Sequence, residues 1–159
     1  MSADAGTWLT PAAFEKLKAE LEYLTTEGRR KIEERISEAR DHGDLRENAE
    51  YDTAKNDQGM MEARIRQLKH LLDTAEVRQV EHSDEVQIGS VVTIIDADGD
   101  EMDVFVAPAE NKAPGMMLAS PDSPLGAALL GASEGDQVSY EAPAGTFTLT
   151  VVAVRPFEG

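Results

Sequence analysis

Apolar residues recur at helical spacing through the first half of the chain. One stretch, from about Pro11 to about Arg40, contains no proline after its start, and Thr10-Pro11 has the composition of a helix start, a capping hydroxyl followed by proline at the first position. A second stretch runs from about Leu45 to about Val77. The expected apolar positions are Phe14, Leu17, Leu21, Leu24, Gly28, Ile32 and Ile36 in the first, and Tyr51, Ala54, Gln58, Met61, Ile65, Leu68, Leu72 and Ala75 in the second. The second set alternates steps of three and four residues, which is typical of a coiled coil.

The two sets match each other in reverse order. In an antiparallel hairpin, the numbers of facing residues add to a nearly constant value, and pairs such as Leu17 with Leu68 or Ile36 with Tyr51 add to between 85 and 87. Half of that value falls at Gly43, a residue suited to a bend. At about 1.5 Å per residue, the arm is roughly 39 Å long. Gly28 would face Gln58, so we expect loose packing at that level.

The second half changes to the short period of β-strands. We expect strands at residues 89–96, 101–107, 115–119, 136–142 and 145–154, and a short helix over 123–130 with Ser123 as its N-cap and Pro124 at its first position. The predicted fold class is α+β. Residues 1–80 form an antiparallel two-helix coiled-coil hairpin with its tip near 41–47. Residues 81–159 form a small antiparallel β domain with one short helix.

Composition limits the possible surroundings and partners. The chain has no cysteine and no apolar run of the ~18 residues that a membrane span needs. Its start lacks the features of a signal peptide, so we expect a cytoplasmic protein without a membrane partner. The net charge is −16, which argues against broad binding to naked nucleic acid. Thirteen of the fifteen lysines and arginines lie in residues 1–80, so the second half is strongly acidic.

The predicted tip is rich in carboxylates. Asp44 and Glu47 have the spacing of a capping box, in which both side chains accept hydrogen bonds from free N–H groups at a helix start. Two carboxylates one turn apart can also share a divalent cation such as Mg²⁺, which needs further oxygen ligands and water. The two roles are compatible, but two carboxylates alone do not make a stable metal site. The remaining ligands would then come from a partner.

Other motifs favour structural interpretations. Asp96, Asp98 and Asp100 resemble part of a calcium loop, but Glu101 and Ala107 stand where that loop needs glycine and glutamate, so we expect a hairpin turn. The three histidines have no ligand spacing. Basic residues along the arm are mixed with acids and suit surface ion pairs, or alternatively a track for a nucleic-acid strand. These basic residues are Lys31, Arg35, Arg40, Arg46, Lys55, Arg64 and Arg66.

Two segments carry a family resemblance. The run EARDHGDLRENAEYDTAKNDQGMMEARIRQL, residues 38–68, closely resembles the Gre family of bacterial transcript cleavage factors. The run SPDSPLGAALLG, residues 120–131, is similar to the C-terminal signature of that family. Together the two segments sample both halves of the chain.

The resemblance implies a fold and a mechanism. The coiled coil would enter the secondary channel of bacterial RNA polymerase, and an FKBP-like C-terminal domain would dock at the rim of the channel. Asp44 and Glu47 would hold a Mg²⁺ ion shared with polymerase and position the water that cuts the backtracked nascent RNA near its 3′ end. The protein would be a monomeric accessory factor rather than an enzyme, with no metal bound on its own.

The resemblance also assigns supporting residues. Asn48 and Tyr51 would support the geometry of the tip, and Arg40, Arg46 and Lys55 would contact RNA or the channel walls. The loop of Asp122, Ser123 and Pro124 would contact the channel rim. Two alternatives remain: a non-catalytic binder of the same channel, which has no need of the GDLREN acid spacing, and an unrelated coiled-coil adaptor whose tip is only a helix cap.

Overall fold

The chain forms two compact units, a helical arm and a β unit. The structure is a computed structural model that describes residues 6–41 and 45–158, with the backbone alone for residues 45–48. The arm is built mainly from Phe14–Ala75, and the β unit from Thr7–Ala13 together with Glu76–Gly159. The predicted α+β class is confirmed.

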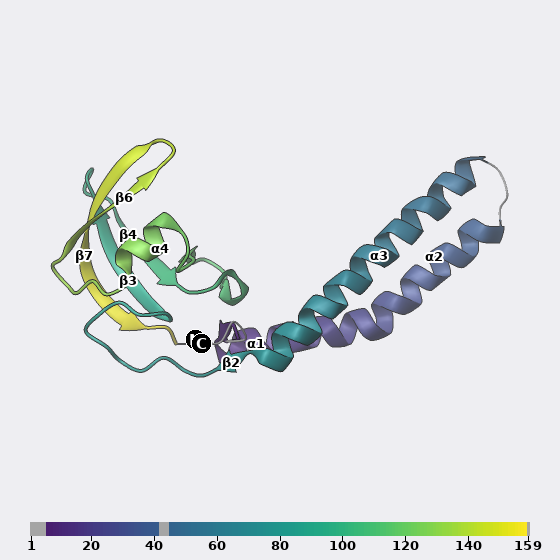
Figure 1. Cartoon of the computed structure of the whole chain (residues 1–159), viewed down its shortest axis with the longest axis horizontal. Helices are drawn as coiled ribbons and strands as arrows, with labels where there is room; N and C mark the ends of the chain where they lie inside the picture. The colour runs from purple at the N-terminus through teal and green to yellow at the C-terminus, as the bar shows by residue number, and fades with distance from the viewer. Residues whose placement is uncertain (1–5, 42–44, 159) are drawn as a thin grey trace. The chain divides into compact units, whose positions relative to one another are not determined.

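The arm is an antiparallel pair of helices (Figure 1). The outgoing half of the hairpin consists of α1 (Pro11–Tyr23), a π-helical turn η1 (Leu24–Gly28) and α2 (Arg29–Asp41). The returning half is α3 (Leu45–Thr74). The hydroxyl of Thr10 accepts a hydrogen bond from the N–H of Ala13 at 3.0 Å, which confirms the predicted cap. The chain reverses between Asp41 and Leu45. The predicted bend residue, Gly43, lies outside the described residues.

The predicted apolar seam of the arm is confirmed. Every predicted seam position is buried or half-buried. Near the outer end, Ile32, Ile36 and Ala54 form one buried cluster, and Tyr51 and Met61 pack against it. This cluster brings together residues of the two helices, including Ile36 and Tyr51, that the sums of residue numbers had paired.

The level of Gly28 differs from the prediction of loose packing. A Cβ atom on Gly28 would lie 3.2 Å from the sulfur of Met61 and 3.4 Å from Cδ2 of Leu24. The space above the glycine is therefore filled, by Met61 rather than by Gln58. The irregularity at this level lies in the backbone, which forms the π turn η1.

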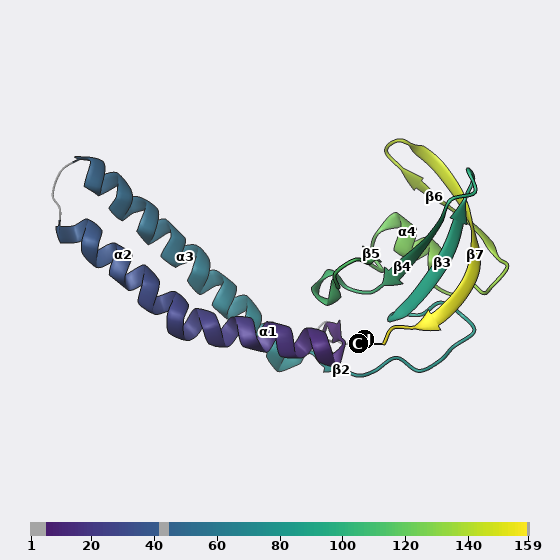
Figure 2. The same ribbon diagram turned by 180° about the vertical axis from the view of Figure 1, so that it is seen from behind.

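The main part of the β unit is a five-stranded sheet with a helix, α4 (Pro124–Leu129) (Figure 2). The strand order is β5-β4-β3-β7-β6, and all neighbours are antiparallel except β4 and β5. The sheet is therefore mixed, and not antiparallel throughout as predicted, because β5 returns to the edge of β4 through the connection that contains residues 107–116. The strands are β3 (Ser90–Asp96), β4 (Glu101–Val106), β5 (Met117–Ala119), β6 (Gln137–Ala142) and β7 (Gly145–Pro156). Each corresponds to one of the five predicted strands.

Alternating side chains of the sheet enter two separate cores. Val92 and Val104 face the core that contains Leu129 of α4. Val91 and Phe105, one residue away on the same strands, face the opposite side and pack with Trp8. The ring of Phe105 meets the ring of Trp8 edge-on at 6.4 Å and stacks on Phe157 at 4.2 Å.

The N-terminal segment belongs to this second core. Its strand β1 (Trp8–Leu9) pairs in parallel with β2 (Glu76–Val77), where the prediction had continued the second helix. The buried amide of Asn111, in the 3₁₀ turn η2 (Ala109–Asn111), accepts from the N–H of Thr10 at 2.8 Å and donates to the carbonyl of Trp8 at 2.9 Å. The predicted division at residues 80 and 81 placed this segment with the hairpin. The structure groups Thr7–Ala13 with the β unit.

Candidate functional site

The outer end of the arm carries the predicted tip residues. Asp44 lies outside the described residues. Arg46, Glu47 and Asn48 lie in the first turns of α3, and their side chains are outside the described part of the structure. Tyr51 is half-buried against Ile32, Ile36 and Ala54, so this ring ties the first turns of α3 to α2. The two helices are therefore packed together on the arm side of the predicted tip.

The two helices leave a hollow just below the tip. It has a volume of about 540 Å³ and is open to solvent. Its walls include the small side chains of Ala39 in α2 and Ala49 in α3, and its charged lining residues are Arg35, Glu38 and Glu50. Its described lining is Arg35, Glu38, Ala39, Ala49, Glu50, Thr53 and Ala54. The described part of its lining thus carries both signs of charge.

Ion pairs between the helices use part of the basic residues of the arm. Arg64 binds both carboxylate oxygens of Glu20, at 2.8 and 2.9 Å, and Arg29 binds both oxygens of Glu62 at 2.9 Å. Hydrogen bonding to these guanidinium groups holds the pKa of Glu20 and the pKa of Glu62 below the ordinary value of 4.5. Arg35 contacts Asp57 across the same gap at 3.0 Å.

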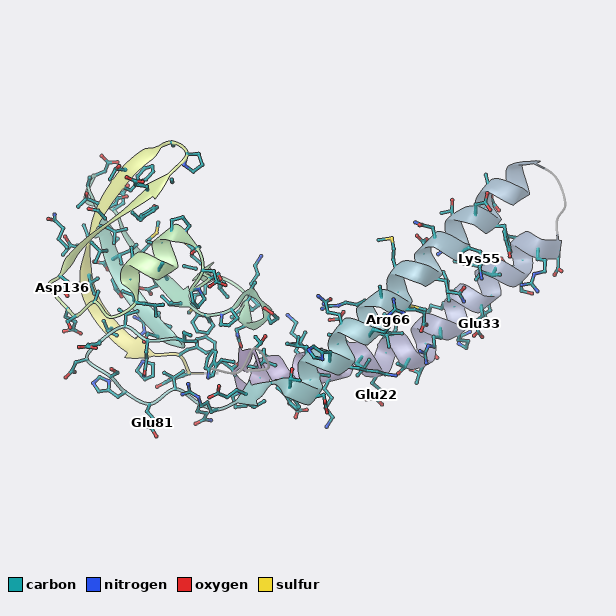
Figure 3. All side chains as sticks on the ribbon, viewed as in Figure 1. Glu22, Glu33, Lys55, Arg66, Glu81 and Asp136 are labelled. Carbon is teal, nitrogen blue, oxygen red and sulfur yellow. The ribbon has the colours of Figure 1, made fainter. Side chains whose placement is uncertain are left out.

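Three other predicted basic residues have no such carboxylate. Arg40, Lys55 and Arg66 are exposed, and within the described ranges no carboxylate lies at ion-pair distance from any of them. Figure 3 shows Lys55 and Arg66 on α3, with Glu33 on α2. Lys55 donates only to the amide oxygen of Gln58, at 3.0 Å. The ion-pair interpretation therefore holds for Arg35 and Arg64, and not for these three.

The loop before α4 is rigidly built. The hydroxyl of Ser123 donates to the carbonyl of Ser120 at 2.7 Å and accepts from the N–H of Gly126 at 3.1 Å, which confirms the predicted N-cap. A Cβ on Gly126 would lie 1.9 Å from the carbonyl oxygen of Ser120, so only glycine fits there. Asp122 and Pro124 are exposed. The hydroxyl of Ser123 is thus engaged in building the loop, while Asp122 and Pro124 are available to a partner.

The aspartates between β3 and β4 form the predicted hairpin turn. Asp96 Oδ1 accepts from the N–H groups of both Asp98 and Asp100, at 2.9 Å each. Carboxylate oxygens of the three residues lie within 4.8 Å of one another, but Asp98 and Asp100 are solvent-exposed. The turn itself accounts for Asp96 at the end of the strand.

Besides the strand pair β1 and β2, the role of Asn111 and the π turn were missed from the sequence. Asn111 links segments about 100 residues apart, and no local pattern signals such a contact. The π turn had a signal, because Leu24, Gly28, Ile32 and Ile36 follow one another at steps of four rather than alternating three and four.

The chain combines a two-helix hairpin arm with a small α+β unit, so it is a two-part α+β protein, and comparison with known proteins defines the family. Residues 7–77 match the model of the transcription elongation factor N-terminal domain of GreA and GreB, and residues 81–156 match the model of the GreA/GreB C-terminal domain. The chain belongs to the GreA/GreB family of transcription elongation factors.

Individual relatives agree over nearly their whole length. The chain is 46% identical to the transcription elongation factor GreA of Saccharopolyspora erythraea, covering 100% of both chains. It is 42% identical to GreA of Streptomyces coelicolor, over 96% of this chain and 95% of that one. The crystal structure of the GreA factor homolog Gfh1 of Thermus thermophilus is 31% identical, covers 94% of this chain and 99% of that one, and aligns with a TM-score of 0.44. Within the described residues, no helix has the length and apolarity required to cross a membrane.

Proposed function

We propose that the arm enters the secondary channel of bacterial RNA polymerase and stimulates endonucleolytic cleavage of backtracked nascent RNA. The carrying observation is the position of the GDLREN acids, residues 43–48, between the end of α2 at Asp41 and the second turn of α3. A hairpin tip is the part of an arm that reaches furthest into a channel. Its carboxylates can therefore meet metal ions that the arm itself does not hold.

In this proposal Asp44 and Glu47 each lend a carboxylate oxygen to a Mg²⁺ ion in the polymerase active site. Such an ion, when bound, would supply the acidity that activates a water for hydrolysis of the phosphodiester near the RNA 3′ end. The chain supplies ligands and polymerase supplies the remainder of the site, so the chain acts as an accessory factor and not as a nuclease. Asn48 and Tyr51 hold the tip in shape.

Contacts away from the tip guide and anchor the arm. Arg40 and Lys55, which have no carboxylate partner among the described residues, meet RNA phosphates or channel walls together with Arg46. Asp122 and Pro124 contact the channel rim, and Ser123 shapes the loop that presents them. The strongly acidic second half suits a basic docking surface.

A transcript cleavage assay tests the proposal. Polymerase is halted in a backtracked complex with labelled RNA and Mg²⁺, and the rate of RNA shortening is measured. We expect Asp44→Ala/Glu47→Ala to lower the stimulated rate by roughly 100-fold, because the ion loses two ligands in the transition state. Asp41→Ala/Glu50→Ala is the matched control, since it removes the same charge from exposed positions beside the tip.

Three outcomes contradict the assignment. Equal cleavage by wild type and the Asp44→Ala/Glu47→Ala variant removes the role of these acids. An equal loss in both double variants indicates a general charge effect. Slower nucleotide addition without cleavage by the wild type favours the non-catalytic channel binder.

A further inference from the structure

The apolar seam of the arm contains an irregular step. Leu24, Gly28, Ile32 and Ile36 follow one another four residues apart. In an α-helix at about 100° per residue, each step of four passes a full turn by about 40°, so three such steps carry Ile36 about 120° around the axis. An unbroken α-helix would therefore turn Ile36 away from a seam that begins at Leu24.

The structure nevertheless buries the outer seam. Ile32, Ile36 and Ala39 are only 6%, 5% and 6% exposed. If the alternating three-and-four spacing continued past Gly28, the seam positions would fall one residue before each of these three. Those residues are Lys31, Arg35 and Glu38, and all three are exposed. The first helical stretch thus contains one residue more than its repeat needs.

The π turn lies at the position where that residue must be absorbed. A π turn closes between residues i and i+5 instead of i and i+4, so it holds one residue more than an α turn. The turn spans Leu24–Gly28, just before the outer seam. Two threonine hydroxyls of the turn bond carbonyl groups of the preceding helical turn. Thr25 Oγ1 donates to the carbonyl of Leu21 at 2.9 Å, and Thr26 Oγ1 donates to the carbonyl of Glu22 at 2.7 Å.

We propose that η1 is a register-correcting turn. It takes up one excess residue and so keeps α2 in phase with α3 as far as Asp41, where the tip begins. The bidentate pair of Arg29 and Glu62 follows immediately after the turn and fixes α2 in the corrected phase. The orientation of α2 at the tip then depends on the number of residues in η1, about three helical turns before the tip.

Two single-residue deletions in the full chain test this inference. Deleting the exposed residue Thr26 removes the excess, so an unbroken α-helix keeps both Ile32 and Ile36 in the seam. We expect its melting temperature, followed by circular dichroism at 222 nm, to stay within about 3 °C of wild type. Deleting the exposed residue Glu34 shortens the chain between the two isoleucines. Ile36 and Ala39 then shift by about 100° around the axis relative to Ile32 and break the alternating three-and-four spacing. We expect a fall of about 10 °C.

Side-chain controls separate register from lost contacts. Thr26→Ala and Glu34→Ala keep the residue count and remove the hydroxyl, or the ion pair of Glu34 with Arg30. Because the chain has no native cysteine, nitroxide labels on Ser37→Cys and Thr53→Cys report the spacing of α2 and α3. We expect the same spacing in wild type and in the Thr26 deletion.

The inference is overturned if deletion of Thr26 lowers the melting temperature as much as deletion of Glu34, or if it changes the distance between the labels. Both measurements use the protein alone. Their outcome is therefore separate from that of the cleavage assay.

Discussion

Asn111 is the residue on which the N-terminal segment of the β unit depends. Its side chain is 3% exposed and bonds the N–H of Thr10, the carbonyl of Trp8 and, at 3.2 Å, the carbonyl of Pro108. Replacing it with alanine leaves the N–H of Thr10 and the carbonyl of Trp8 without this partner, whereas the carbonyl of Pro108 keeps its bond from the backbone N–H of residue 111. We expect Asn111→Ala to lower the free energy of unfolding of this unit by about 2 to 3 kcal/mol.

Trp8 offers a direct measurement of that loss. It is the single tryptophan of the chain and packs in the same core, so its fluorescence during urea unfolding reports this unit. Asn111→Asp keeps the acceptor for Thr10 but loses both amide donors, and we expect it to be destabilised as well. Lys112→Ala, at the neighbouring exposed position, is the control. An unchanged midpoint for Asn111→Ala contradicts the structural role.

At the scale of the element, α3 carries a glycine that its packing does not require. A Cβ atom on Gly59 would have no neighbour within 4 Å, and the residue lies in the helix interior. Alanine lowers the backbone entropy of the unfolded chain, so we expect Gly59→Ala to stabilise the arm by about 1 kcal/mol. Circular dichroism during urea unfolding measures this gain. Gly28→Ala should gain less, because its Cβ would approach Met61 at 3.2 Å.

The ion pairs of the arm predict a specific pH dependence. Hydrogen bonding to Arg64 lowers the pKa of Glu20 below 4.5. A carboxyl group whose pKa is lowered by folding stabilises the fold above its unfolded pKa, and this contribution is lost as the pH falls through the folded value. Wild type should therefore exceed Glu20→Gln in stability by about 1 kcal/mol or less at pH 7, and the difference should vanish as the pH falls well below 4.5.

Thermal melts of both proteins between pH 7 and pH 3 measure this difference. Salt should reduce it, because both side chains are partly exposed. Glu15→Gln, at an exposed position of α1, supplies the comparison for a carboxylate without a recorded ion pair among the described residues. A difference that stays constant across the pH range shows that the Glu20 pair contributes nothing.

The elements differ in how far the sequence predicts them. The seam of the arm follows from local spacing, so the hairpin and the cluster of Ile32, Ile36 and Ala54 could be predicted. The five strands follow from alternation and turn residues. The strand pair β1 and β2 could not be predicted, because each strand has only two residues and so no periodic signal, and the two strands lie far apart along the chain. The irregular step at Gly28 was visible, but spacing alone does not say whether a helix bends, loosens or forms a π turn.

Within the candidate site, too, local interactions could be predicted from the sequence and specific partners could not. Ser123 and Pro124 could be placed because capping is a local interaction. The engagement of both hydrogen-bonding roles of Ser123 required the carbonyl of Ser120, which no spacing rule supplies. Likewise, mixed charge along the arm predicted ion pairs in general. It could not separate Arg64, which binds Glu20, from Arg66 on the same helix.

At the scale of the whole molecule, the proposed function assigns different tasks to the two units. In that proposal the β unit would present Asp122 and Pro124 for docking, and the arm would carry Asp44 and Glu47 for chemistry. If the tasks are separate, mutations in each unit affect different kinetic quantities. A tip mutation removes an interaction made in the transition state and lowers the maximal cleavage rate, whereas a docking mutation weakens binding.

Titrating each variant against backtracked polymerase distinguishes these effects. We expect Asp44→Ala/Glu47→Ala to lower the maximal rate while the concentration for half-maximal effect on polymerase stays near that of wild type, as measured by competition. We expect Asp122→Lys to raise that concentration about tenfold and to leave the rate at saturation unchanged, because it places a like charge against a basic rim. Glu141→Lys makes the same charge change at another exposed position of the β unit and serves as the control. Because the two sites share no residue, the combined variant should show both defects at their separate sizes. A loss of maximal rate in Asp122→Lys at saturation would instead show that docking also sets the position of the tip.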